Sequence, residues 1–334
     1  MDIRALALPR RRQRVGMTLI ELMISMALGL LVIIAATSAL VASRGTSRDT
    51  EAIARIQENA RIAFDFMRRS LREAGGTPCG TAAGDIAITS GAGWYATGQY
   101  EKLALEGMQD TGFAGVSASI KKIDNSDFAV AYASGSGDSL RLITLASDAG
   151  GGGISPVIGK SGGTLALRSM NGFDPDGLML ACDQSNGVIF AGGTFTASPT
   201  ASMPDRGTFS SPDFDPDAFG LSTVNAYLAM LQPEVWFIGA NERGGKSLYR
   251  VIGDNASADE IASNAVALRL SYLVPDKAAY VEANNIDPDD WPNVKAIRIL
   301  LTLRNDSTLA TGYVERTLAH TVALRNRQPT QPPP

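Results

Sequence analysis

The sequence predicts an α+β protein in which one long N-terminal helix packs against a head of antiparallel β-strands. An uncharged apolar run over residues 22–43 leads into an amphipathic segment over residues 46–74. After that segment, short apolar runs alternate with stretches rich in Gly, Ser, Asp and Asn. The first pattern is typical of a helix and the second of strands joined by loops.

Charge is distributed unevenly along the chain. The formal net charge is −4 for all 334 residues. Residues 1–16, however, contain one carboxylate and five arginines: Arg4, Arg10, Arg11, Arg12 and Arg14. Without them the remainder carries about −8. An acidic body argues against nucleic acid as the main partner. With a single histidine, His320, a metal site or catalytic triad built on histidine is not expected. We predict no cofactor, no metal site and no enzymatic activity.

The apolar run is long enough to cross a membrane. Its 22 uncharged positions would span ~33 Å as a helix, about one bilayer core. The denser positive charge before it predicts a cytoplasmic N-terminus and a head on the other side. An ordinary signal peptide is cut after its apolar stretch, whereas the sharp break here, at Gly16-Met17, precedes it. A plain signal anchor is an alternative, but it leaves Glu21 unexplained unless that carboxylate is merely tolerated at headgroup level.

Residues 16–23 read Gly-Met-Thr-Leu-Ile-Glu-Leu-Met. This stretch resembles the class III signal of type IV prepilins. That signal is a short basic leader ending in Gly, followed by an apolar residue, Thr or Ser, Leu, an aliphatic residue and Glu. The resemblance implies that a membrane prepilin peptidase cuts between Gly16 and Met17 and methylates the new N-terminus. The family usually has Phe where this chain has Met17.

Glu21 suggests how such a subunit could assemble. After the cut, the amine of Met17 and the carboxylate of Glu21 lie at the same end of one apolar helix. In a filament, the carboxylate could pair with the amine of a neighbour displaced along the axis. An unpaired, desolvated partner costs several kcal/mol, so this pair would select the correct axial register.

The amphipathic segment continues the helix. Gly75, Gly76 and Pro78 end it. A helix from Met17 to Ala74 would be ~87 Å long, but Gly45 could instead separate a membrane helix from a juxtamembrane one. The apolar residues of the segment recur at steps of three and four and predict one stripe docked on the head: Ile53, Ile56, Ala60, Ala63, Phe64, Met67 and Leu71.

A second resemblance narrows the family. The stretch Gln57-Glu58-Asn59-Ala60-Arg61, and Arg72-Glu73-Ala74-Gly75 ahead of Cys79, resemble the PilW group of minor pilins. That group implies a subunit that helps initiate or cap a type IV pilus and supports adhesion and twitching motility. Its implied partners are other minor and major pilins, the prepilin peptidase and the inner-membrane assembly machinery. It would sit in the inner membrane with a periplasmic head, then in the pilus.

Two alternatives remain open from the sequence. A type II secretion pseudopilin shares the leader and the helix, but is generally shorter. A membrane-anchored periplasmic enzyme or binding protein would keep its N-terminus uncut.

Five segments are predicted: a leader (1–16), an apolar helix (17–44), an amphipathic helix (45–76), a β-rich head (77–327) and a disordered tail (328–334). The cysteines, Cys79 and Cys182, predict one disulfide in an exported head, with two free buried thiols as the alternative. Loops or insertions are expected at 147–163 and 191–220. Strands are expected at 139–145, 178–182, 187–190, 235–238, 247–252, 266–274, 294–303 and 313–326.

Alternating carboxylates at Asp213, Asp215 and Asp217 raise the question of calcium. An EF-type loop requires Gly and Glu where this chain has Ala218 and Val224. A solvated acidic loop is therefore the preferred interpretation.

Overall fold

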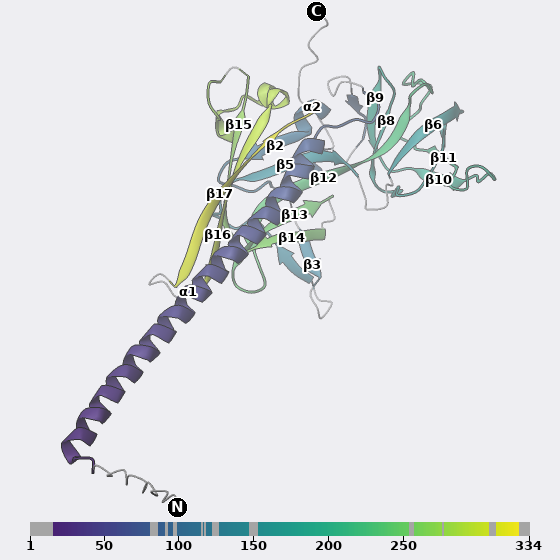
Figure 1. The fold of residues 1–334 in the computed structure, drawn as a ribbon. Helices are drawn as coiled ribbons and strands as arrows, with labels where there is room; N and C mark the ends of the chain where they lie inside the picture. Colours follow the sequence, from purple (N-terminus) through teal and green to yellow (C-terminus); the bar gives the residue numbers. More distant parts are fainter. Residues whose placement is uncertain are drawn as a thin grey trace, which may run out of the picture.

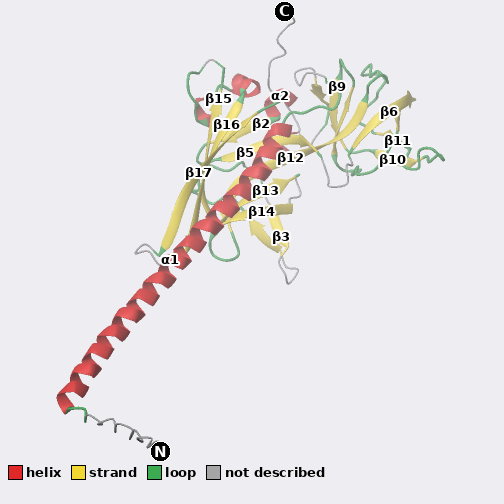
Figure 2. Ribbon diagram, in the orientation of Figure 1, coloured by secondary structure: helices red, strands yellow, loops and turns green. Residues whose placement is uncertain are grey.

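The computed structural model describes residues 16–326, except 81–85, 91–92, 96–98, 115, 117, 122–126, 147–152, 254–256, 276 and 307–311. The predicted leader up to residue 15 and the predicted tail at 328–334 lie outside the described residues. The fold is the predicted α+β arrangement, with one long helix joined to a sheet-rich head (Figures 1 and 2).

Helix α1 (Leu19–Glu73) is unbroken over 55 residues and is therefore ~83 Å long. Gly45 lies inside it, so the alternative of two separate helices is wrong. The helix ends where Gly75 adopts a positive φ of 69°. Asn326, near the other end of the described chain, donates from Nδ2 to the carbonyls of Arg72, Glu73 and Ala74 at 3.4, 3.5 and 3.4 Å. This amide supplies donors to carbonyls that a helix end leaves unpaired.

The two halves of α1 have different surroundings. The first half extends away from the head (Figure 1) and is exposed. The second half lies across the head and buries one stripe, which consists of Ala52, Ile56, Ala60, Ala63, Met67, Ser70 and Leu71. The predicted docking stripe is confirmed, because Ile53 and Phe64 also pack against the core from partly buried positions.

Two sheets form the head. The smaller is antiparallel, in the order β15 (Ala265–Leu273), β16 (Ala296–Asp306), β17 (Tyr313–Ala323). The larger has 14 strands among the described residues and is organised around β12 (Tyr227–Ala240). Its other strands are β1 (Ile86–Ile88), β2 (Leu105–Met108), β3 (Ala118–Lys121), β4 (Asp127–Val130), β5 (Ser139–Leu145), β6 (Ile154–Ser161), β7 (Thr164–Leu167), β8 (Leu178–Cys182), β9 (Gly187–Ala191), β10 (Thr194–Ala197), β11 (Gly207–Ser210), β13 (Lys246–Ile252) and β14 (Ser257–Ser263).

Strand β12 connects two parts of the head. Its second half pairs with β5 and β13 beneath α1, whereas its first half pairs with β6 and β8 farther from the helix. The core beneath α1 combines the helix stripe with Trp236, Leu248 and residues of the smaller sheet such as Leu301. A separate aromatic core, which includes Phe190, Phe209 and Phe214, fills the outer part. Short helices α2 (Tyr100–Leu103), η2 (Gly93–Tyr95), η3 (Ala283–Asn285) and η4 (Pro288–Asn293) complete the head.

The predicted strands are confirmed, including the hairpin between β12 and β13. The loops predicted for residues 147–163 and 191–220 are partly wrong, because β6 lies in the first range and β10 and β11 in the second. Pro156 and Gly159 interrupt the apolar alternation of β6. Strand β10 is short and mostly exposed, so its order comes from pairing with β11 rather than from burial.

Candidate assembly helix and its junction with the head

The start of α1 has the geometry of a capped helix. Thr18 is the N-cap residue, and its Oγ1 accepts a hydrogen bond from the backbone N–H of Glu21 at 3.3 Å. Thr-x-x-Glu is also the spacing of a capping box, so the sequence itself carries a signal for the helix start. A carboxylate in the first turn is favourable beside the positive end of the helix dipole. Thr18 thus fixes where the helix begins, two residues after Gly16.

Gly16 and Met17 precede the helix and are exposed. A Cβ atom at Gly16 would meet no atom within 4 Å, so steric crowding within the chain does not require glycine here. The peptide bond between the two residues is outside the helix and open.

The first half of α1 presents apolar side chains to its surroundings on every side. Leu19, Leu31 and Val41 are 78%, 62% and 70% exposed. An 18-residue window of α1 has a mean hydropathy of 2.5 with none of it buried, so α1 can cross a membrane by length and composition. An exposed apolar surface of this size indicates lipid or other apolar helices as its surroundings.

Three hydroxyl groups in this half are hydrogen bonded to the backbone of the helix itself. The hydroxyls of Ser25, Thr37 and Ser38 donate to carbonyls one turn earlier, at 2.7, 2.8 and 2.9 Å. Glu21 is the one charged residue over 19–43. Within the described part of the chain, no hydrogen bond or ion pair reaches its carboxylate. The carboxylate is therefore free to pair with a group from outside the described residues.

A buried carboxylate lies where α1 meets the head. Glu234 of β12 is 3% exposed and accepts hydrogen bonds from Trp236 Nε1 at 3.0 Å and Gln232 Nε2 at 3.2 Å. Burial raises the pKa of Glu234, although Ser70 of α1 and Arg250 of β13 favour the charged form. The guanidinium of Arg250 is 3.9 Å from the carboxylate. The junction thus includes a polar cluster linking the helix to two strands.

Sequence reasoning missed this cluster. The available signal was a polar residue, Ser70, at a position that continues the apolar stripe of α1. The other signal was Glu234, which together with Gln232 interrupts a largely apolar run in β12.

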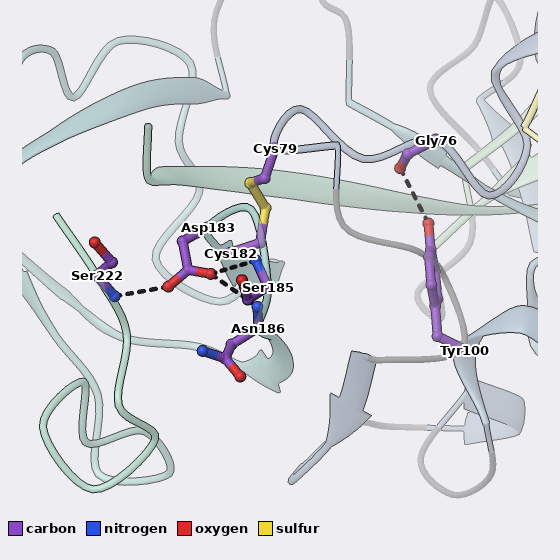
Figure 3. Close-up of a disulfide and its surroundings, with 8 residues drawn as sticks. All are labelled: Gly76, Cys79, Tyr100, Cys182, Asp183, Ser185, Asn186 and Ser222. Atoms are coloured by element: carbon purple, nitrogen blue, oxygen red, sulfur yellow. Dashed lines mark hydrogen bonds between the residues drawn. A yellow bond between two sulfur atoms is a disulfide. The ribbon is translucent and has the colours of Figure 1, made fainter. Parts of the chain in front are cut away.

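The predicted disulfide is confirmed, and the alternative of two free thiols is wrong. Cys79 and Cys182 are bonded, with their Cα atoms 5.9 Å apart (Figure 3). The bond ties the segment after α1 to the end of β8, across 103 residues of sequence. In the same view, Tyr100 donates from its hydroxyl to the carbonyl of Gly76 at 3.3 Å. The covalent bond and the hydrogen bond both hold the exit of the helix to the head.

Asp183, next to the disulfide, organises the neighbouring turns. Its carboxylate accepts the backbone N–H groups of Ser185, Asn186 and Ser222 at 2.7, 2.8 and 2.7 Å (Figure 3). Burial alone would raise the pKa of Asp183, but these donors bring it below its ordinary value.

The acidic loop at 213–217 uses its carboxylates within the chain. Asp215 Oδ1 accepts from the N–H groups of Asp217 and Ala218 at 2.9 and 3.4 Å. Asp217 pairs with Lys160 at 2.9 Å. Among the described residues, no three His, Cys, Asp or Glu side chains are grouped so that they could hold a metal ion.

We predict that Glu234→Gln removes a pH-dependent contribution to stability. The raised pKa means that folding favours protonated Glu234, so its stabilising contribution is full below pH 4.5 and is lost as the pH rises through the raised value. The wild-type free energy of unfolding minus that of the variant should therefore fall as the pH rises above 4.5. Urea titrations of the full chain in detergent, followed by tryptophan fluorescence, measure this difference. A difference that rises or stays flat with pH would contradict it.

The N-terminal region matches a family model. Residues 11–37 fit the model described as the prokaryotic N-terminal methylation motif, which covers part of the predicted leader and the start of α1. No curated protein matches the chain. A solved structure, a type IV-like pilin from Thermus thermophilus, aligns over 82% of this chain and 99% of that chain, at 11% identity and a TM-score of 0.29. The chain thus carries a prokaryotic N-terminal methylation motif at the start of a long helix, whose first half is apolar and exposed and whose second half joins a sheet-rich head.

Proposed function

We propose that the protein is a filament subunit that is cut between Gly16 and Met17 and assembles through the apolar half of α1. The carboxylate of Glu21 is the observation that carries this proposal. It stands at the end of an exposed apolar helix without a partner in the described chain, four residues after the proposed cut. A carboxylate near the start of a membrane helix is energetically costly and by default marks a function.

The cut would create the missing partner. It frees an ammonium group at Met17, which is one short turn from the carboxylate along the chain. In a bundle of parallel α1 helices, the amine of one subunit pairs with Glu21 of a neighbour displaced along the axis. Only the displacement that pairs these charges avoids a desolvated, unpaired ion, which costs several kcal/mol. Glu21 thus sets the register of assembly.

Before assembly, the same half of α1 would hold the subunit in the inner membrane. Arg44 and Arg48 follow the apolar run, and the predicted leader before it is more basic, which orients the N-terminus toward the cytoplasm. The head would then lie in the periplasm, where disulfides persist. The bond between Cys79 and Cys182 fits that compartment.

Within this class we favour a minor pilin of the PilW-like group. It would help initiate or cap a type IV pilus through helix bundling and head–head contacts, and support adhesion and twitching motility. Its partners would be other minor and major pilins, the prepilin peptidase and the inner-membrane assembly machinery. The stretch at 57–61 that carries this resemblance lies where α1 docks: Ala60 is buried, and Asn59 Nδ2 donates to the carbonyl of Ser263 at 3.3 Å.

We predict that the protein purified from its native membrane or filaments begins at Met17 and carries an N-terminal methyl group. Mass spectrometry of the N-terminal peptide measures both features. Gly16→Val should leave the precursor uncut, because the glycine before the proposed cleavage site would be absent. Detection of residues 1–16 in the wild-type filament protein would contradict the proposal and favour a membrane-anchored enzyme or binding protein.

We predict that Glu21→Ala is processed and inserted into the membrane, but enters filaments at least about tenfold less efficiently, because the amine of the neighbour loses its partner. Quantitative immunoblots of sheared filaments and membranes measure this ratio. Glu51→Ala is the matched control, since Glu51 is on the same helix and forms only an exposed pair with Arg55. Equal incorporation of the two variants would show that Glu21 has no role in assembly.

A deletion strain distinguishes the pilus from a type II secretion pseudopilus. A strain that lacks pili but still secretes would favour the pilus.

A further inference from the structure

Strand β17 is an open edge of the smaller sheet. It pairs with β16 on one side, over 11 residue pairs from Tyr313 to Ala323 without any shift of register. No strand of the described chain pairs with its other side. An open edge presents unpaired backbone donors and acceptors and is a template for another chain.

The ladder shows which residues face outward. Leu324 donates its N–H to the carbonyl of Lys295 at 2.8 Å, one step beyond the pair Ala323 and Ala296. In an antiparallel ladder, inward and outward backbone groups alternate. The outward N–H and C=O groups therefore belong to Thr317, Ala319, Thr321 and Ala323. These four residues are exposed, and no hydrogen bond to their outward backbone groups exists within the described chain.

Common forms of edge protection are missing from this part of β17. Natural edges usually carry a proline, a bulge, inward-pointing charges or a covering element. Residues 317–323 contain no proline and no Lys, Arg, Asp or Glu, and the ladder behind them is regular.

A groove follows the open edge between β17 and α1. Its first part, of about 1020 Å³, is lined by α1 residues such as Arg61 and by β17 residues up to His320. Its second part, of about 620 Å³, is lined by Arg68 and Arg72 of α1 and by residues 321–325. Arg68 lines both parts, so the two adjoin along the edge.

The groove is basic although the chain as a whole is acidic. Arg61, Arg68 and Arg72 are spaced by seven and four residues and therefore share one face of α1. The first part also contains Glu58 and Asp65, and Asp65 is bound to Arg68 at 2.6 Å. The second part contains three arginines, Arg325 being the third, and no carboxylate.

We propose that the β17 edge binds an extended acidic segment of a partner chain, which adds to the smaller sheet as a fourth strand. Its backbone would pair with the outward groups of residues 317–323. Because side chains alternate along a strand, carboxylates at every second position would face the arginines of α1.

The same charges argue against a second copy of this chain at the edge. Pairing β17 with β17 of another copy would place two sets of these arginines close together, and like charges at an interface are unfavourable. The proposal concerns the head and the docked half of α1, and it does not depend on whether the exposed half of α1 assembles into filaments.

The test uses a fluorescent nine-residue peptide that alternates Glu and Thr, with a Lys-Thr peptide as its control. Binding to the full-length chain in detergent is followed by fluorescence anisotropy. We expect saturable binding of the Glu peptide, at least about tenfold tighter than that of the Lys peptide and weakened by salt. Equal binding of both peptides, or no binding of either, would overturn the proposal.

The backbone and the charges are tested separately. The double variant Ala319→Pro/Thr321→Pro removes two outward N–H groups and leaves the bonds to β16 intact, so affinity for the Glu peptide should fall about tenfold. Ala319→Val/Thr321→Val keeps both N–H groups and is the matched control, with affinity within about twofold of wild type. Arg72→Glu/Arg325→Glu should reverse the preference toward the Lys peptide. Undiminished binding by the proline variant, or an unreversed preference, would contradict the proposal.

Amide hydrogen exchange on the wild-type chain gives a measurement without substitutions. The Glu peptide should slow exchange at residues 317, 319, 321 and 323. If exchange at these residues is unchanged, strand addition is contradicted, even if the proline variant fails to fold. Analytical ultracentrifugation measures whether the edge instead pairs two copies of this chain. Dimerisation of the wild type that is lost in the proline variant would assign the edge to a second copy and overturn the acidic partner.

Discussion

The structure depends on one helix that has to satisfy two different surroundings. Helix α1 is continuous from Leu19 to Glu73, yet only its second half is buried against the head. Its first half is apolar on all sides and exposed, so the isolated chain leaves a large apolar surface uncovered. Lipid can cover that surface, and so can other copies of the same kind of helix. A subunit that moves from a membrane into a filament needs a helix that fits both.

The junction keeps this helix in a fixed position on the head. Apolar contacts along the buried stripe supply most of the packing. Polar groups fix the position of the helix end on the head. Glu234 interacts with Ser70 of the helix, and Asn326 donates hydrogen bonds to the last carbonyls of the helix. The disulfide then secures the chain directly after the helix. A force that acts on the exposed half of α1 would therefore be transmitted to the sheets through the buried stripe, the polar contacts and the disulfide together.

The sequence predicted the helix, its docked stripe and eight of the 17 strands in the described part of the chain. These are the elements whose apolar period and length can be recognised locally and whose apolar residues are buried. It did not predict β10, since four mostly exposed residues are ordered by pairing with β11 rather than by their own pattern. The placement of Glu234 beneath Ser70 and the groove along β17 also escaped prediction, because both join residues that are distant in sequence. The Gly16-Met17 break and Glu21 were readable from spacing alone, and the spacing of Thr18 and Glu21 also carries the signal for the helix cap.

Continuity of α1 through Gly45 is the central claim, because a break there would uncouple the exposed half from the head. Spin labels at Ala36→Cys and Ala54→Cys, both exposed positions, test it by electron–electron double resonance on the full chain with its disulfide intact. The two sites are 18 residues, or five full turns, apart, and a straight helix places them ~27 Å from each other on the same face. The account predicts a single narrow distribution at that distance, in detergent and in lipid. A broad or clearly shorter distribution would show that the helix bends or breaks at Gly45 and would contradict it.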